Sequence, residues 1–450
     1  MDQDSPRSNV FYRKLNRRYP RIVRGEGCYL FDADGRRYLD GSGGAFVANL
    51  GHGVPEIAAA IAEQAGKVGY LNGTAFTHDP VEQLGAEVAA AMPVGLDLVY
   101  PLCSGSEAVE AALKLARQFW VESGRPAKRK IVTLSPSYHG NTLLALSASG
   151  RPHYSATFRD WLVEVVRVPA PYPYRCECHG APPLCPSCSG DALEAALIAA
   201  GPDTVAAFIA EPVGGSSTGA SLPPSGYWNR VRQLCDQYEV LWVADEVLTG
   251  AGRTGTWSAL EPYGAVADIV TLGKGIAGGY VPLSAVVAPR RLAEVLAAGT
   301  GGLQHAQTFS HHPVLCAAGV ATIRYLREHH LIQRCAEMGR VLHARLAGLR
   351  EHPLVGDVRG RGLLAGVELV ADRESREPLP RSAMAAEALT AAALDEGLVV
   401  WPNTGHADGV NGDLVMLAPP FVITEDQVDE LVSSLGRALT RVAERLGAAR

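Results

Sequence analysis

DIVTLGKG, at residues 268–275, places a lysine between two glycines directly after a short apolar run. The run at residues 269–272 is rich in Val, Ile and Leu, which is typical of a strand buried on both faces of a parallel sheet. A lysine that is largely buried after such a strand has a lowered pKa, so its amine becomes a nucleophile able to form a Schiff base. The flanking glycines let a bulky group approach the backbone. The alternative is an ordinary exposed loop lysine, so Lys274 needs support from other segments.

Short apolar segments recur on both sides of this stretch and alternate with amphipathic helical patterns. This alternation predicts an α/β domain with a mainly parallel central sheet flanked by helices. The strands expected are residues 96–102, 130–134, 161–166, 205–210, 240–244, 269–272 and 283–287. The helices expected between them include residues 107–121, 190–200 and 227–238. Because ligands of open α/β sheets bind at the carboxyl ends of the strands, motifs that follow these strands should lie together.

Two further motifs follow predicted strands. At residues 102–107, LCSGSE joins a strand to a helix, where free backbone N–H groups at Gly105 and the Ser106 hydroxyl can bind an anion such as phosphate. The alternative is a turn that merely begins a helix. At residues 241–246, LWVADE leaves Asp245 at the end of a buried strand, where its charge is costly unless it is paired, for example with a protonated ring nitrogen. The alternative is an aspartate that caps the next loop.

The chain from residue 331 onward differs in kind. It contains amphipathic helical patterns at residues 331–349 and 384–397, a closing helix at 425–446, and strand-like pieces at 363–370 and 414–417. These predict a second, smaller α+β domain. The N-terminal segment, with a hairpin at residues 29–40 around Asp34-Gly35, is expected to join it. The predicted division is therefore residues 1–75 with the small domain, 76–328 as the large domain, and 329–450 as the small domain.

Bulk composition sets limits on partners and location. At 450 residues the chain is long for one hydrophobic core, which agrees with two lobes. Lys plus Arg number 41 and Asp plus Glu 47, so the net charge of −6 argues against nucleic acid as a partner. No apolar run reaches the roughly 18 residues of a membrane helix. The acidic start, Met1-Asp2-Gln3-Asp4, is not followed by an apolar stretch and does not resemble a secretory signal. We therefore expect a soluble, cytoplasmic protein.

Taken in order, the motifs resemble the class III (subgroup II) aminotransferases, which are pyridoxal 5′-phosphate (PLP) enzymes of fold type I. The motifs that carry the resemblance are the turn at 104–107, Tyr138-His139-Gly140, Glu211-Pro212-Val213, Asp245-Glu246 and Gly273-Lys274-Gly275, and it extends from residue 25 to residue 423. It implies a homodimeric transaminase with active sites at the subunit interface. Such an enzyme moves an amino group from an amine or amino acid to a keto acid or aldehyde by double displacement.

The resemblance also implies a role for each matched residue. Lys274 holds the cofactor and moves a proton during catalysis, and Asp245 pairs with the ring nitrogen, which makes the ring an electron sink. Gly105 and Ser106 hold the phosphate. The remaining implied cofactor contacts are Tyr138 and Val247 on the two ring faces, His139 and Glu211 nearby, and Thr308, which reaches the phosphate from the neighbouring subunit.

The substrate side departs from the family pattern. Many members place arginines that bind the substrate carboxylate where Met416 and Trp401-Pro402 stand here, and Leu248 replaces a frequent glutamine. Without those arginines, the sequence favours an ω-transaminase. Glu211 meets either a cationic amine of the substrate or a backbone group or water. Phe46 and Trp401 either line the substrate pocket or pack in the core.

Four of the nine cysteines lie close together in a Pro-rich segment: Cys176, Cys178, Cys185 and Cys188. Four thiolates can bind structural zinc and order a long loop. The spacing is not that of a standard zinc ribbon, and PLP chemistry needs no metal. We assign no metal to the active site and leave zinc in this loop open.

Two other functions remain as alternatives. A PLP-dependent decarboxylase, racemase or aminomutase on the same scaffold uses the same lysine. A non-catalytic PLP-binding protein is the more remote alternative, because loss of Lys274 is its expected signature and the lysine is present.

Overall fold

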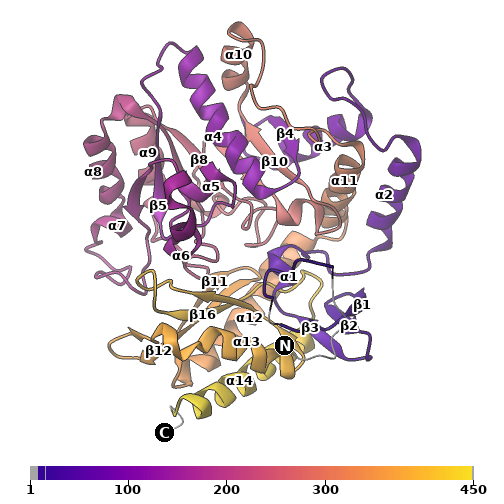
Figure 1. Ribbon diagram of the computed structural model, residues 1–450, viewed down its shortest axis with the longest axis vertical. Helices are drawn as coiled ribbons and strands as arrows, with labels where there is room; N and C mark the ends of the chain where they lie inside the picture. The colour runs from indigo at the N-terminus through magenta and orange to yellow at the C-terminus, as the bar shows by residue number, and fades with distance from the viewer. Residues whose placement is uncertain (1–8, 16, 448–450) are drawn as a thin grey trace.

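The computed structural model describes residues 9–15 and 17–447 and has two lobes (Figure 1). The large lobe is built on a seven-stranded sheet in the order β4-β10-β9-β8-β7-β5-β6. The strands are β4 (Leu98–Leu102), β5 (Lys130–Ser135), β6 (Val166–Pro169), β7 (Val205–Ala210), β8 (Leu241–Asp245), β9 (Ile269–Leu272) and β10 (Ser284–Ala288). Only β10 runs antiparallel to its neighbours, β4 and β9, so the expected mainly parallel sheet is confirmed.

One predicted strand is wrong in position. Residues 161–166 were expected to form a strand, but β6 covers only Val166–Pro169, and the chain before it forms a 3-10 helix, η1 (Ala156–Trp161). Trp161 and Val163 are exposed, at 70% and 54%, so their apolar character does not reflect burial in the sheet. The other six strands are confirmed to within two residues at each end.

Helices cover both faces of this sheet. The longest of them is α4 (Gly105–Glu122), which begins with a capping box at Ser104 and buries a row of small and apolar side chains. The other helices of the lobe are α2 (Pro55–Lys67), α3 (Asp79–Ala91), α8 (Asp191–Ala200), α9 (Tyr227–Gln237), α10 (Arg290–Ala298) and α11 (Pro313–Glu328). Short connecting helices are α1 (Gly43–Phe46), α5 (Leu143–Ala148), α6 (Pro152–Ser155), α7 (Pro186–Ser189), η2 (Pro202–Thr204), η3 (Glu261–Tyr263) and η4 (Lys274–Ala277).

The small lobe contains two sheets. One has the order β11-β12-β16-β15, with β13 paired to β12, and the other has the order β1-β2-β3-β14. Its strands are β1 (Ile22–Glu26), β2 (Tyr29–Asp32), β3 (Arg37–Asp40), β11 (Val355–Arg361), β12 (Leu364–Asp372), β13 (Glu377–Pro378), β14 (Leu398–Val399), β15 (Trp401–Thr404) and β16 (Asp413–Leu417). Its helices are α12 (Leu331–Leu346), η5 (Ala347–Glu351), η6 (Arg381–Ala383), α13 (Ala385–Asp395) and α14 (Glu425–Leu446).

The N-terminal segment contacts both lobes. The hairpin expected at residues 29–40 is confirmed as β2 and β3, and β3 pairs in parallel with β14 of the C-terminal segment. Helix α2, in contrast, packs against α11. The domain boundaries at residues 75 and 328 therefore stay predictions.

The expectation about residues 1–4 falls on residues outside those that the structure describes. Within residues 9–15 and 17–447, no helix has the length and apolar character needed to cross a membrane.

Candidate active site

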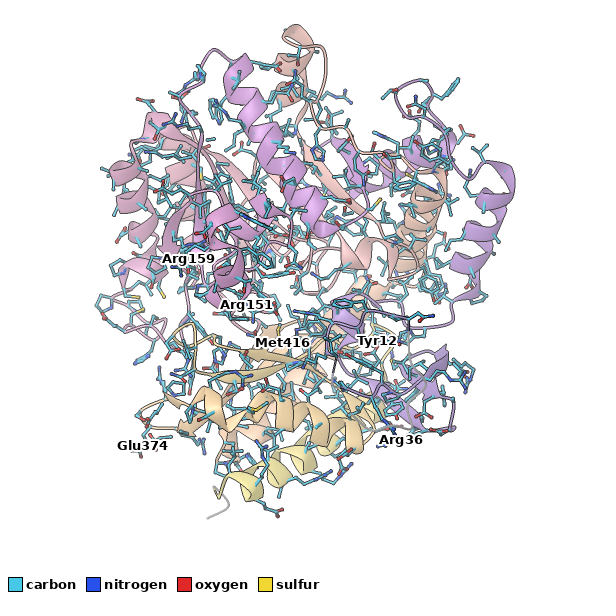
Figure 2. The ribbon with its side chains drawn as sticks, viewed as in Figure 1. Tyr12, Arg36, Arg151, Arg159, Glu374 and Met416 are labelled. Carbon is cyan, nitrogen blue, oxygen red and sulfur yellow. The ribbon has the colours of Figure 1, made fainter. Side chains whose placement is uncertain are left out.

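A cavity of about 260 Å³ lies where the two lobes meet. Figure 2 places Arg151 and Met416 in this central region, between the upper and lower lobes. The cavity is lined by residues from the large lobe, by Phe46 at the end of α1 and by Trp401 at the start of β15. The remaining lining residues are Arg13, Ala45, Gly105, Ser106, Tyr138, His139, Gly140, Asn141, Arg151, Tyr154, Glu211, Ser216, Asp245, Val247, Leu248 and Lys274.

The motifs singled out in the sequence meet at one edge of the large sheet. Strands β4, β5, β7, β8 and β9 all run in the same direction, and each delivers a motif at its carboxyl end. The motif residues are Gly105, Tyr138, Glu211, Asp245 and Lys274, and all five line the cavity. The expectation that motifs far apart in sequence converge there is confirmed, as the topology of a parallel sheet requires.

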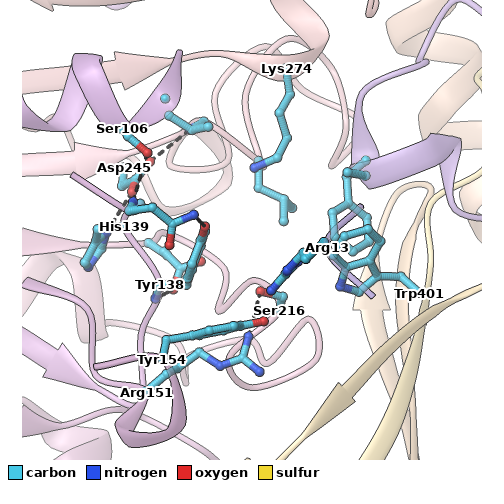
Figure 3. Close-up of a pocket in the computed structure, with 18 residues that line it drawn as sticks. Arg13, Ser106, Tyr138, His139, Arg151, Tyr154, Ser216, Asp245, Lys274 and Trp401 are labelled. Atoms are coloured by element: carbon cyan, nitrogen blue, oxygen red, sulfur yellow. Dashed lines mark hydrogen bonds and ion pairs between the residues drawn. The ribbon is translucent and has the colours of Figure 1, made fainter. Parts of the chain in front are cut away.

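Lys274 extends into the middle of the cavity (Figure 3). Burial lowers the pKa of its amine, while the negative charges of Asp245 and Glu211 act in the opposite direction. The backbone of Lys274 has φ +45°, a conformation unusual for a residue other than glycine. Strain of this kind costs on the order of 1–3 kcal/mol and is characteristic of functional sites. The lysine therefore stands on a strained backbone segment, and its amine lies in the cavity.

Asp245 is a buried carboxylate with several donors. Its Oδ2 lies 2.7 Å from Nδ1 of the fully buried His139, and its Oδ1 accepts hydrogen bonds from the Val247 N–H and the Thr271 hydroxyl, both at 3.1 Å. The Thr133 hydroxyl lies 3.4 Å from Nε2 of His139. Each carboxylate oxygen has two lone pairs, so Oδ2 can accept a second donor from the cavity.

The turn before α4 is packed so closely that only glycine fits. A Cβ added at Gly105 would lie 2.6 Å from Cγ1 of Val247, and one added at Gly140 would lie 2.5 Å from Oγ of Ser106. The backbone N–H of Asn141 donates to the Ser106 hydroxyl at 3.0 Å. Since this turn opens an 18-residue helix, its free N–H groups and helix dipole favour an anion at the edge of the cavity.

Glu211 is partly buried, and its carboxylate already has three donors. These are the backbone N–H groups of Tyr138 and Gly215, each at 3.1 Å, and the Ser217 hydroxyl at 3.2 Å. Burial raises the pKa of Glu211, partly offset by the nearby His139. These contacts match the alternative in which backbone groups hold Glu211, and a contact with a substrate amine stays a prediction.

One wall of the cavity is apolar. The rings of Phe46 and Trp401 lie 5.4 Å apart between centroids, and both pack with Leu248 and Met416 in one cluster. Met416 lies opposite Trp401 in the pairing of β15 with β16 and is fully buried. Met416 thus stands where many family members have a carboxylate-binding arginine, and it packs in the apolar cluster of this wall.

Arg151 is a cationic residue of the cavity that the sequence analysis missed. It is only 6% exposed, donates to the Ser216 hydroxyl at 3.2 Å and to the Thr404 carbonyl at 3.5 Å, and contacts Oδ1 of Asn403. Its guanidinium lies 4.7 Å from the centre of the Tyr154 ring. Arg13, which is exposed, approaches the same ring at 5.8 Å.

Neither Arg13 nor Arg151 forms an ion pair with a carboxylate of the described residues. The only signal in the sequence is an arginine before Pro152, which does not distinguish a binding residue from a surface one.

Thr308 does not line this cavity. It is exposed, and its carbonyl accepts a hydrogen bond from the Tyr70 hydroxyl at 3.1 Å. This position is compatible with a role toward a neighbouring subunit, but that role and the homodimer stay predictions.

The groups of the cavity fit PLP. A buried lysine can bind an aldehyde, a helix N-terminus with Ser106 can bind a phosphate, and a buried carboxylate with spare acceptor capacity can pair with a protonated ring nitrogen. Tyr138 and Val247 supply ring-sized surfaces in the same cavity. The cavity therefore meets three separate requirements of PLP, for its aldehyde, its phosphate and its ring nitrogen.

Comparison with known proteins agrees with this site. The family Aminotransferase class-III matches residues 13–439. The chain is 36% identical over 434 residues to a hypotaurine/taurine–pyruvate aminotransferase of Paracoccus denitrificans, covering 94% of this chain and 92% of the relative. It is 33% identical over 440 residues to a putrescine–pyruvate aminotransferase of Pseudomonas aeruginosa, covering 96% and 93%.

A solved transaminase structure is also similar to this chain over nearly its whole length. The ω-transaminase of Pseudomonas jessenii in complex with PMP has a TM-score of 0.88 and 30% identity, covering 96% of this chain and 94% of the other. A match over nearly the whole chain, with the lysine, aspartate and anion-binding turn in one cavity, settles the family. The chain belongs to the class III aminotransferases, the PLP-dependent transaminases of fold type I.

Proposed function

We propose that this transaminase accepts substrates that carry an anionic group and that Arg151 binds this group. The observation that carries the proposal is a buried arginine in the same cavity as Lys274, without a carboxylate partner among the described residues. A buried charge is costly unless it is paired, so a site of this kind is completed by an anion from the substrate.

The cofactor is held, in this proposal, by the groups that fit it. Lys274 and Asp245 are the catalytic residues, and the cofactor contacts are Gly105, Ser106, Tyr138, His139, Glu211, Val247 and, from the neighbouring subunit, Thr308. Bound PLP supplies an electron sink for the carbon that loses its proton. Lys274, whose amine has a pKa lowered by burial, takes that proton and returns it during the exchange.

His139 has the task of holding Asp245 in place. It is fully buried behind the carboxylate and contacts Oδ2 at 2.7 Å, which leaves the cavity side of Asp245 to the ring nitrogen. An ionised Asp245 keeps that nitrogen protonated, and protonation makes the ring a better electron sink.

The substrate lies between two unlike walls. Arg151 with Tyr154 and Arg13 forms a cationic end, and Phe46, Leu248 and Trp401 form an apolar side. An amine whose anionic group reaches Arg151 presents its amino carbon to Lys274, with its apolar part against the ring of Trp401. This arrangement supports an ω-amine donor with a terminal carboxylate or sulfonate. Pyruvate or another keto acid can place its carboxylate at Arg151 in the second half-reaction.

The amino donors named for the two relatives differ in charge. Taurine carries a sulfonate and suits Arg151, whereas putrescine is a diamine without an anionic group. The choice between them therefore depends on the cavity of this chain, and the buried Arg151 favours the anionic donor.

Kinetics of Arg151 variants test the proposal. The donors are taurine and β-alanine, which carry an anionic group, and butylamine, which carries none. Loss of a charge-assisted hydrogen bond costs about 1.5–3 kcal/mol, so Arg151→Gln should raise KM for the anionic donors by roughly 10- to 100-fold. KM for butylamine should change by less than about 2-fold, because butylamine has no anionic group for Arg151 to bind.

Two control variants separate binding from folding. Arg151→Lys keeps the charge but not the planar fork and should give an intermediate KM. Arg159→Gln changes a nearby exposed arginine outside the cavity and should leave all donors unaffected (Figure 2). An equal loss for butylamine and taurine in Arg151→Gln would contradict the proposal and assign Arg151 to loop packing alone.

A homodimer belongs to the same proposal, since Thr308 serves the cofactor of the neighbouring subunit. Light scattering should give twice the chain mass of 47.6 kDa, and a monomeric mass in the active enzyme would contradict it.

The other activities weighed from the sequence are not favoured. The relatives and the solved structure described above bear the names of aminotransferases and transaminases, which does not favour a decarboxylase, racemase or aminomutase. A non-catalytic protein is not favoured either, because Lys274 and Asp245 lie together in an intact cavity.

A further inference from the structure

Four cysteine sulfurs meet in the loop between β6 and α8, outside the active-site cavity. The Sγ of Cys176 lies 3.5 Å from that of Cys178 and 3.4 Å from that of Cys188, and the Sγ atoms of Cys178 and Cys185 are 3.3 Å apart. All four sulfurs lie within 4.8 Å of one another, and none is in a disulfide. We propose that these four cysteines bind one zinc ion tetrahedrally.

The spacing of the sulfurs fits such a site. With Zn–S bonds of about 2.3 Å, the edges of a tetrahedron of sulfurs are about 3.8 Å. The three shortest separations, 3.3 to 3.5 Å, are a few tenths of an ångström below this value, and all four sulfurs stay within 4.8 Å of one another. Cys176 contacts both Cys178 and Cys188, and Cys178 also contacts Cys185, so the sulfurs surround a common centre and do not form two separate pairs.

The local backbone supports the same arrangement. Cys185 and Cys188 bracket the start of α7, where the Cys188 N–H donates to the Cys185 carbonyl at 2.9 Å. This turn brings the two sulfurs of the C-x-x-C pair to the same side. Cys188 is fully buried and the other three are partly buried, so the centre is shielded from solvent. The unusual C-x-C spacing of the first pair is accommodated because the chain turns at Cys176 and Cys178, whose carbonyls accept from the N–H groups of His179 and Ala181.

Cationic groups flank the cluster. Four thiolates and one Zn²⁺ carry a net charge of −2, which favours positive neighbours around the ligands. Arg175 immediately precedes Cys176, and the Arg376 side chain donates to the Tyr174 carbonyl at 2.6 Å and contacts Nδ1 of His179. The loop is thus anchored by arginines on the side from which the first two cysteines come.

The cluster lies next to a junction between the lobes. Just before the cysteines, the Tyr172 hydroxyl donates to Glu368 of β12 at 2.5 Å, and Nε of Arg175 donates to the same carboxylate at 2.6 Å. Zinc would fix the loop that carries both residues and so hold the large lobe against β12. The ion would be structural, because none of the four cysteines lines the active-site cavity and protein sulfurs would fill all four ligand positions.

Metal analysis of the purified holoenzyme tests the proposal without any variant. The full-length protein is reduced, equilibrated with Zn²⁺ and dialysed, and zinc should remain at about one ion per chain. Replacement by Co²⁺ should give the d–d and thiolate charge-transfer bands of a tetrahedral sulfur site. Reduced protein that retains neither metal would overturn the proposal. Iron retained in preference to zinc would overturn the identity of the metal.

Variants then assign the ligands. Cys185→Ser should reduce bound zinc at least 10-fold, whereas Cys103→Ser, the one cysteine outside the cluster that is not buried, should leave zinc content unchanged. If Cys185→Ser fails to fold, a chelator applied to the native enzyme gives the same information. Removal of zinc by the chelator should make the four cluster thiols reactive toward a maleimide. Peptide mapping can identify which cysteines are labelled. Equal zinc in both variants, or cluster thiols that are paired as disulfides and take up no zinc after reduction, would overturn the proposal.

Discussion

Asp245 shows how much of the active site depends on single side chains. Its two oxygens accept from His139, Val247 and Thr271, all within 3.1 Å, and its carboxylate still faces the cavity. In the proposed function, the partner of this carboxylate on the cavity side is the protonated ring nitrogen of bound PLP.

Asp245→Asn removes the charge while nearly preserving the shape. The amide cannot hold the ring nitrogen protonated, so kcat/KM for both half-reactions should fall by on the order of 100-fold or more. Rapid-mixing measurements of each half-reaction, on protein with confirmed cofactor content, provide the check. Asp34→Asn, in the exposed turn of the hairpin, serves as the control. An Asp245→Asn enzyme with wild-type rates would remove Asp245 from the catalytic residues.

The sequence was informative for residues that follow strands and uninformative for those that do not. Lys274, Asp245 and Gly105 stand directly after buried apolar segments, and the geometry of a parallel sheet then brings them together. Arg151 lies in a loop before a proline, and its position depends on contacts with Asn403 and Ser216, which are distant in sequence. No local pattern encodes such a contact.

At the level of elements, the start of α4 forms the side of the cavity where the phosphate is proposed to bind. The helix begins at Gly105 because Ser104 and Glu107 form a capping box, and the missing Cβ of Gly105 lets Val247 approach. The position of the turn and the position of Val247 are therefore coupled.

Gly105→Ala should disturb this coupling. The new Cβ would lie 2.6 Å from Val247, so that Val247 must move or the turn must shift. We expect cofactor affinity to fall by roughly 10-fold, about 1.4 kcal/mol, which a titration of the apoenzyme with PLP can measure. Gly85→Ala in α3 is the matched control, because a Cβ there meets no atom within 4 Å and alanine favours a helix. Unchanged cofactor affinity in Gly105→Ala would mean that the close packing of Gly105 against Val247 does not contribute to cofactor binding.

The bounds of buried elements were predicted better than those of exposed ones. β7 and β9 lie where the apolar runs placed them, because both are buried along their whole length. β6 lies at the edge of the sheet, and the apolar residues before it, including Trp161, are exposed. An apolar pattern predicts a strand because apolar residues are usually buried. It therefore misplaces the strand where exposed apolar residues precede an edge strand.

In the molecule as a whole, one buried carboxylate, Glu368, is the centre of an ion-pair network between the two lobes. Glu368 of β12 pairs with Arg359 and Arg175, each within 2.6 Å, accepts from Tyr172, and lies 3.1 Å from Nε2 of His406. Burial alone would raise the pKa of Glu368, but the charges of Arg359, His406 and Arg175 hold it well below its usual value. Sequence alone could not reveal this network, because its members come from four separate segments.

Glu368→Gln should destabilise the enzyme in a pH-dependent way. Removing one member of a buried ion pair costs about 3–5 kcal/mol, which should lower the thermal midpoint by roughly 5–10 °C near neutral pH. The pKa of Glu368 is lower in the folded state than its unfolded value of 4.5, so its contribution is present above pH 4.5 and lost as pH falls toward the folded pKa. The difference between wild type and variant should therefore shrink below pH 4.5.

Calorimetry from about pH 3 to about pH 8, a range that extends well below the unfolded pKa, measures this difference. Glu374→Gln, at an exposed position of the next turn, is the control and should match wild type throughout (Figure 2). A deficit of the same size at about pH 3 and about pH 7 would mean that Glu368 acts through packing and not through its charge.

The four sides of the cavity have one more consequence. Lys274 enters from one direction, Asp245 and His139 lie on a second side, Trp401 on a third, and Arg151 with Tyr154 on a fourth (Figure 3). No mirror plane relates these sides, so a bound amine presents only one of two prochiral hydrogens to the lysine. Protons leave and return on the same face, and an amine made here from an asymmetric ketone should be of a single hand, which chiral chromatography of the product reports.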